Sequence, residues 1–180
     1  MSALPALGPI TEEQYLSDPA FEHCEYVNGI VVERNVGGKP HSRIQANCCG
    51  FIWSYLRTNR IGYVVTELTC RLNGRGYSRF RLPDVAVVLG DESTEQRYLE
   101  RSPDLVVEVR SPDDSLTSQL RKMDDYFENG CRLVWLVLPE EKSVLILAPN
   151  AAPRTATAGE TLDGGGVLPG LSVAVDDLFV

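Results

Sequence analysis

The sequence of 180 residues lacks several features that mark particular classes of protein. No apolar run approaches the roughly 20 residues needed to span a bilayer, so a membrane-spanning helix is not expected. The first ten residues lack the basic segment of a secretory signal peptide. The five cysteines form no Cys-x-x-Cys pair, which argues against a structural zinc site and fits free thiols in a reducing compartment. Together these absences predict a cytoplasmic protein without a membrane partner.

A net positive charge is also lacking, because the chain carries −8 at neutral pH. This balance argues against a protein that coats nucleic acid. Basic residues nevertheless concentrate in residues 39–81, which contain eight basic residues and one acidic residue. Such a segment can face phosphate groups, or it can form a solvated surface of salt bridges, and charge alone favours the second interpretation. The candidate phosphate-contacting residues are Arg43, Arg71, Arg75, Arg79 and Arg81.

No repeat, low-complexity tract or linker divides the chain, so residues 11–180 are predicted to form one domain after a loose arm at residues 1–10. Asn28 and Gly29 predict a tight hairpin turn. Apolar spacing predicts a long helix over residues 41–60. Apolar runs predict strands near residues 62–66, 82–89, 104–110, 132–138 and 143–147.

A second helix is expected over about residues 115–129, ended by Asn129 and Gly130. Its apolar stripe is expected to comprise Leu116, Leu120, Met123 and Phe127. The order of elements predicts an α/β or α+β fold: a mixed central sheet flanked by helices, with an N-terminal hairpin and short C-terminal strands.

The strand near residues 104–110 carries a carboxylate, Glu108, inside an apolar run. A carboxylate in a buried strand is costly unless a cation or a metal compensates it. Asp84 opens another buried strand, and the two carboxylates can converge if these strands are neighbours. Convergent carboxylates suit Mg²⁺, which takes oxygen ligands and can polarise a phosphoryl oxygen.

Several further side chains are candidates for the same site. Arg110 lies two residues after Glu108, and side chains alternate along a strand, so both are expected on one face. Lys122 lies in the helix after that strand and can reach back over its end. The remaining candidates are Glu25 as another carboxylate, and His41 and Gln119 as auxiliary residues.

These stretches resemble the putative restriction endonuclease family of the PD-(D/E)XK nuclease superfamily. The central matches are Leu-Pro-Asp-Val-Ala-Val-Val at residues 82–88 and Pro-Asp-Leu-Val-Val-Glu-Val-Arg-Ser-Pro at residues 103–112. Others are Glu-Tyr-Val-Asn-Gly-Ile-Val-Val at 25–32, His-Ser-Arg-Ile at 41–44, Leu-Arg-Lys-Met-Asp-Asp-Tyr-Phe at 120–127 and Asn-Gly-Cys-Arg-Leu-Val-Trp-Leu-Val at 129–137. Each stretch is short, but their order and spacing together are fairly specific.

The resemblance implies a bacterial restriction-endonuclease-like fold and hydrolysis of DNA with Mg²⁺ or Mn²⁺. It implies Asp84 and Glu108 as metal ligands, with Glu25 as the acidic residue of the N-terminal element. The usual lysine position holds Arg110, and the resemblance implies that Lys122 takes the catalytic role.

Two alternative interpretations fit the same candidate residues. The arginine at the usual lysine position, together with the acidic net charge, also fits a catalytically degenerate module that binds nucleic acid or supports an assembly. Each candidate carboxylate can instead belong to a turn or a structural salt bridge. A homodimer acting on double-stranded DNA is expected, since two-fold symmetry suits cleavage of both strands, and the strand at residues 143–147 is a candidate dimer edge.

Overall fold

A tight hairpin begins the first of two main sheets. Asn28 and Gly29 take positive φ angles of 51° and 88°, which a two-residue hairpin turn requires. They join β1 (Cys24–Val27) to β2 (Ile30–Glu33). β4 (Cys70–Gly74) and β5 (Tyr77–Arg81) complete a four-stranded sheet with the order β2-β1-β5-β4. The structure, a computed structural model, describes residues 8–34, 37–74, 77–90 and 96–180.

The segment before this sheet packs against it. α1 (Glu12–Ser17) begins after Thr11, whose side chain caps the helix, and a short 3-10 helix, η1 (Pro19–Phe21), follows. Residues 1–7 of the predicted arm lie outside the described residues. Ile10, at the end of that arm, donates its amide hydrogen to the carbonyl of Gly29 at 2.8 Å, so this part of the arm adds a contact to the hairpin.

The central sheet has six strands in the order β10-β9-β8-β7-β6-β3. β6 and β7 pair antiparallel, whereas β7 and β8 pair in parallel, so the sheet is mixed as predicted. The strands are β3 (Gly62–Thr66), β6 (Val85–Leu89), β7 (Leu105–Val109), β8 (Leu133–Leu138), β9 (Ser143–Leu147) and β10 (Arg154–Ala156). The two strands that carry the candidate carboxylates are therefore direct neighbours.

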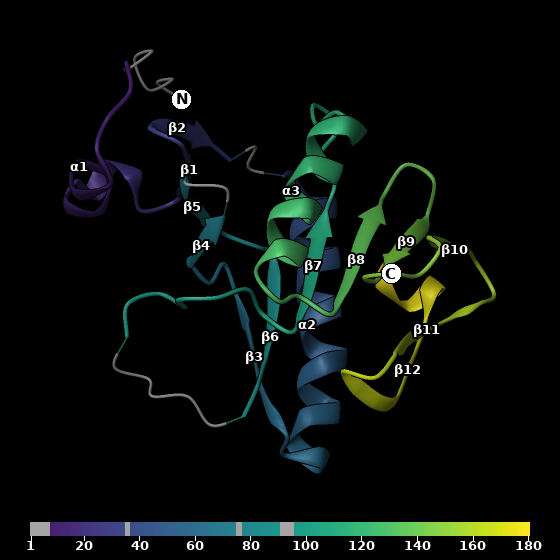
Figure 1. Cartoon of the computed structure of the whole chain (residues 1–180). Helices are drawn as coiled ribbons and strands as arrows, with labels where there is room; N and C mark the ends of the chain where they lie inside the picture. The colour runs from purple at the N-terminus through teal and green to yellow at the C-terminus, as the bar shows by residue number, and fades with distance from the viewer. Residues whose placement is uncertain (1–7, 35–36, 75–76, 91–95) are drawn as a thin grey trace.

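Two helices cover opposite faces of the central sheet (Figure 1). α2 (Lys39–Asn59) packs against the face that carries Val107 and Val109 of β7. α3 (Leu116–Glu128) packs against the other face, where Val106 contacts Met123 and Tyr126 within one apolar cluster. Because side chains alternate along a strand, Glu108 faces α3 together with Val106.

The C-terminal segment extends the core on the α2 side. β11 (Thr161–Gly164) and β12 (Leu168–Ala174) form a separate two-stranded sheet, and a 3-10 helix, η2 (Val175–Leu178), follows. The amide of Asn47 on α2 donates to the carbonyls of Leu178 and Val180 at 3.1 and 3.0 Å. These bonds fix the end of the chain to α2.

Two expectations are corrected by the fold. The predicted apolar stripe of α3 is wrong at Leu116 and Leu120, which are 44% and 40% exposed, whereas Met123 is buried and Phe127 packs against the same apolar cluster. The buried α3 residues are Gln119, Met123, Asp125 and Tyr126, since polar partners compensate the burial of its polar side chains. The candidate dimer edge is also wrong, because β9 pairs with both β8 and β10.

Across the described parts of the chain, no helix combines the length and the apolar character needed to cross a membrane.

Candidate functional site

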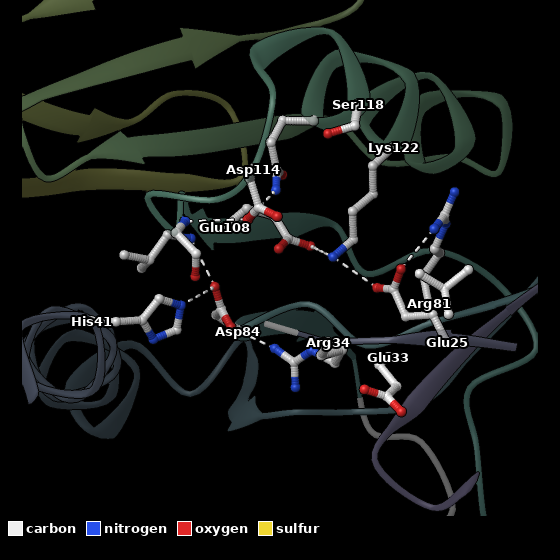
Figure 2. Close-up of a pocket in the computed structure, with 14 residues that line it drawn as sticks. Glu25, Glu33, Arg34, His41, Arg81, Asp84, Glu108, Asp114, Ser118 and Lys122 are labelled. Carbon is white, nitrogen blue, oxygen red and sulfur yellow. Dashed lines mark hydrogen bonds and ion pairs between the residues drawn. The ribbon is translucent and has the colours of Figure 1, made fainter. Parts of the chain in front are cut away.

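A cavity of about 150 Å³ opens where the four-stranded sheet, the central sheet and α3 meet (Figure 2). Five of its lining residues are carboxylates: Glu25, Glu33, Asp84, Glu108 and Asp114. Three are permanently charged cations, Arg34, Arg81 and Lys122, and His41 also lines it. The carboxylates outnumber the permanent cations by two, so the cavity favours an additional positive charge.

Asp84 and Glu108 face each other across two neighbouring strands. The antiparallel register pairs Val85 with Val107, and its continuation by one residue places Asp84 opposite Glu108. Directly opposite residues lie on the same face of an antiparallel pair. Both residues are almost fully buried, at 2% and 3% exposed. The predicted convergence of these two carboxylates is confirmed by their common cavity.

Lys122 bridges two carboxylates that come from different sheets. Its Nζ lies 2.8 Å from Oε1 of Glu108 on β7 and 2.7 Å from Oε1 of Glu25 on β1. The Lys122 side chain is only 11% exposed. Burial alone would lower the pKa of Lys122, but Glu108, Glu25 and Asp84 outweigh that effect and raise it. Lys122 is therefore a charged group and not a neutral base at physiological pH.

The two carboxylates that share Lys122 differ in their protonation. Burial raises the pKa of Glu108 to about 7, and the charges of Asp84 and Glu25 add to this rise although Lys122 opposes it. Burial would also raise the pKa of Glu25, but Lys122 and Arg81 bring it down to about 2. The difference arises because Glu25 has a second cation, Arg81 at 2.6 Å, and accepts the amide hydrogen of Leu82.

Asp84 is held by the side chains of Arg34 and His41 and by one backbone amide. Its Oδ1 accepts a hydrogen bond from Arg34 at 2.5 Å. Its Oδ2 accepts the amide hydrogen of Val109 at 2.7 Å and lies 3.3 Å from Nε2 of His41. Burial would raise the pKa of Asp84, but His41, Lys122 and Arg34 outweigh it and lower the pKa. The hydrogen bond to Asp84 in turn raises the pKa of His41.

Gln119 places an acceptor at the cavity. Its Nε2 donates to Oδ2 of Asp114 at 2.9 Å, and this bond fixes the amide orientation because an ionised carboxylate only accepts. The opposite atom, Oε1, is buried and receives no donor from the described residues. A buried acceptor without a donor is costly, so a hydrogen from a water that reaches this atom would satisfy it.

Residues on α3 and β5 also contact Glu25 and Glu108, the two carboxylates that form a charged centre with Lys122. Tyr126 donates its hydroxyl hydrogen to Oε1 of Glu108 at 2.7 Å. Arg81 joins Oε2 of Glu25 to Oδ2 of Asp125, each at 2.6 Å. Lys122, Asp125 and Tyr126 lie three and four residues apart on α3, which places them on adjacent turns of one face. The helix therefore fixes the two carboxylates that flank Lys122.

The structure does not bring Arg110 to this centre, contrary to expectation. β7 ends at Val109, and NH2 of Arg110 lies 3.2 Å from Oε2 of Glu140 and from Oε1 of Glu141 in the turn between β8 and β9. Alternation along a strand no longer governs a side chain beyond the strand's end. Lys122, and not Arg110, is the cation beside Glu108.

Three of the five candidate phosphate-contacting arginines form ion pairs, which agrees with the interpretation that charge alone favoured. Arg71 pairs with Glu12 and Glu100, at 2.5 and 3.6 Å. Arg79 and Arg81 both pair with Asp125. Arg43 is exposed and donates to the carbonyl of Phe179 at 3.4 Å, and Arg75 lies outside the described residues. Of the described arginines in this set, only Arg81 lines the cavity.

Three participants were missed from the sequence: Arg34, Tyr126 and Asp114. The spacing of Gln119, Lys122 and Tyr126, at i, i+3 and i+7, is a signal for a shared helix face and could have identified the tyrosine. Arg34 ends an apolar run without any distinguishing pattern. Its contact with Asp84 spans 50 residues, so no local signal could have found it.

The donor set suits a hard divalent cation. Nowhere in residues 8–34, 37–74, 77–90 and 96–180 do three or more His, Cys, Asp or Glu residues gather so as to hold a metal ion. Asp84 and Glu108 are two opposed carboxylates in one cavity that could hold such an ion. Mg²⁺ is commonly held by one or two carboxylates, with waters and substrate phosphates as its other ligands. Two carboxylates in an acidic cavity therefore meet this requirement.

The mixed sheet, the flanking helices and the site at their junction define a nuclease-like α+β fold. A crystal structure from Anabaena variabilis, described as that of a putative nuclease belonging to DUF820, superposes with a TM-score of 0.83. The two chains are 24% identical, and the match covers 95% of this chain and 98% of that one. At this identity the likeness establishes the fold alone.

The sequence matches the Uma2 family, described as putative restriction endonuclease, over residues 12–176, and the chain belongs to this family. The resemblance read from the sequence motifs is thereby confirmed. A comparison with curated proteins finds no match.

Proposed function

We propose that this protein is a metal-dependent endonuclease that hydrolyses phosphodiester bonds of DNA at the cavity between its two sheets. One observation carries the proposal: Lys122 lies beside Glu108, and Glu108 faces Asp84 across adjacent strands. A buried cation next to two opposed carboxylates combines a place for a divalent cation with a charge that can stabilise a phosphoryl transition state. Family membership supports the same reaction class.

Asp84 and Glu108 would hold Mg²⁺ or Mn²⁺. When bound, the ion supplies Lewis-acid polarisation of the phosphoryl oxygen and a water with a lowered pKa. Glu25 lines the same cavity, but Lys122, Arg81 and the Leu82 amide engage its carboxylate. Glu25 therefore serves to position Lys122.

Lys122 and Gln119 supply the remaining chemistry from one face of α3. The ammonium group of Lys122 stays charged, so it stabilises negative charge that develops on the phosphate and does not accept a proton. Oε1 of Gln119 accepts a hydrogen from the attacking water and orients it, since an amide is too weak a base to remove the proton. The proton passes to solvent or to the departing oxygen.

The test compares the parent with two variants and two matched controls. Plasmid DNA and single-stranded DNA are incubated in Mg²⁺ or Mn²⁺ with the parent, Asp84→Asn and Lys122→Met. Asp113→Asn and Lys142→Met change an exposed carboxylate and an exposed ammonium outside the cavity lining. We expect cleavage by the parent and both controls, with a loss of at least about a hundredfold in the two site variants.

Cleavage that persists in Asp84→Asn and Lys122→Met would refute the assigned site. Absence of cleavage by the parent, together with absence of calorimetric metal binding, would instead support a degenerate nuclease fold that serves as a binding or assembly module. That second function is favoured by one observation, which is that Arg34, His41 and the Val109 amide already engage both oxygens of Asp84.

A further inference from the structure

Arg34 occupies an oxygen of Asp84 that the proposed metal ion also requires. The guanidinium donates to Oδ1, whereas the other two partners of Asp84 approach Oδ2. Arg34 directly follows β2 in the four-stranded sheet, and Asp84 directly precedes β6 in the central sheet. A divalent cation and a guanidinium repel each other, so both cannot approach one carboxylate oxygen closely.

We propose that Arg34 is an exchangeable partner of Asp84 and a phosphate-binding residue. In the metal-free protein, Arg34 neutralises Asp84. When Asp84 is engaged with a divalent cation, Arg34 releases it and contacts a phosphate group of the bound DNA. This inference rests on the proposed nuclease function and adds a binding residue to it.

The surroundings of Arg34 leave room for such a displacement. A second cavity of about 330 Å³ shares Arg34 and His41 with the first, so the guanidinium lies between two open spaces. The second contact of Arg34 is weak, because NH1 lies 3.6 Å from Oε1 of Glu67, whose side chain is 45% exposed. The Arg34 side chain is itself 18% exposed. Among the described residues, Asp84 is therefore the one close partner that holds Arg34.

The guanidinium is chemically suited to both partners. Its planar fork binds carboxylates and phosphates in the same two-pronged manner. Arg34 remains charged throughout, so a release from Asp84 leaves a cation at the cavity that must find another anion. A DNA phosphate beside the opposed carboxylates is the anion that the proposed reaction brings there.

The exchange makes metal binding and DNA binding mutually favourable. Metal binding frees Arg34 for the phosphate, and a phosphate that holds Arg34 leaves Asp84 open for the metal. Such coupling is reciprocal, so each ligand must strengthen the binding of the other by the same factor.

The test uses Arg34→Met, which keeps the length of the aliphatic stem and removes the charge. Mn²⁺ binding to the DNA-free protein is measured by titration calorimetry. Binding of a fluorescent DNA duplex is measured by anisotropy with Ca²⁺ in place of Mg²⁺. We expect Arg34→Met to bind Mn²⁺ roughly tenfold more tightly and the duplex roughly tenfold more weakly than the parent. Arg154→Met, which removes an exposed arginine paired with Asp163 on β11, is the control and should change neither affinity.

The two affinities separate this exchange from a purely structural role. A structural arginine would weaken both affinities when replaced, and circular dichroism checks that the variant is folded. Unchanged or weaker Mn²⁺ binding by Arg34→Met refutes the exchange at Asp84, and unchanged duplex binding refutes the contact with phosphate. If the parent cleaves DNA while either refutation holds, the nuclease function stands without this inference. If neither protein binds Mn²⁺ and the parent does not cleave, the nuclease function fails and the inference fails with it.

Discussion

Replacing Lys122 by methionine removes a buried charge without opening a cavity, because the methionine chain fills most of the space of the lysine stem. In the parent, Nζ contacts Glu25 and Glu108 at 2.7 and 2.8 Å. Removal of one partner from a buried ion pair costs about 3–5 kcal/mol. Glu25 retains Arg81, and among the described residues Glu108 retains the Tyr126 hydroxyl alone. The loss should therefore come mainly from Glu108.

The cost of Lys122→Met should depend on pH in a defined direction. Glu108 has a folded pKa of about 7, above its ordinary value of 4.5, so folding favours its protonated form and stability is lost as pH rises through about 7. Without Lys122 this pKa rises further, and the ionised form becomes costlier. We expect a loss of about 3 kcal/mol at pH 8.5 and about 1 kcal/mol at pH 5.5, where Glu108 is protonated in both proteins.

Urea unfolding followed by circular dichroism at both pH values measures these losses. For a domain of this size, 3 kcal/mol corresponds to a fall in Tm of roughly 10 °C. Lys142→Met, at an exposed turn position, should stay within about 0.5 kcal/mol of the parent. A loss for Lys122→Met that is equal at the two pH values, or larger at pH 5.5, would contradict the assignment of Glu108 as the group that depends on Lys122.

Two further predictions concern Glu108. Tyr126→Phe removes the hydroxyl that donates to this carboxylate and should lower stability at pH 8.5 by about 1.5–3 kcal/mol in urea unfolding, whereas Tyr55→Phe, which loses a hydrogen bond at the surface, should cost less than about 1 kcal/mol. Equal losses of stability in the two variants would argue against a charged Glu108 as the acceptor of the Tyr126 hydrogen bond. Metal binding should release a proton at pH 6, because Glu108 must ionise to act as a ligand, and the release should disappear by pH 8.5. Calorimetry in two buffers with different ionisation enthalpies measures this release, and equal release at both pH values would exclude Glu108 as its source.

Local sequence patterns predicted the parts of the fold that depend on neighbouring residues. Asn28 and Gly29 specified a turn through their positive φ angles, and Thr11 specified the start of α1. The carboxylate pair could also be predicted, on the condition that the two apolar runs form adjacent strands. Asp84 and Glu108 then follow from register alone.

Contacts between distant segments could not be predicted in this way. The stripe on α3 was misassigned because Gln119 and Tyr126 are buried by partners that lie outside the helix. Arg110 was misassigned because acidic residues in the β8–β9 turn, about 30 positions away, attract it more closely than Glu108 does. Arg34 reaches Asp84 only because two sheets pack together, and packing between sheets leaves no periodic signal.

The charged centre around Lys122 forms only when three separate parts of the fold come together. Glu25 arrives with the four-stranded sheet, Glu108 belongs to the central sheet, and Lys122 joins them from α3. A nascent chain, or a molecule in which the N-terminal sheet has detached, has the sequence of the site without its geometry. The proposed chemistry would therefore require that both sheets and α3 have docked.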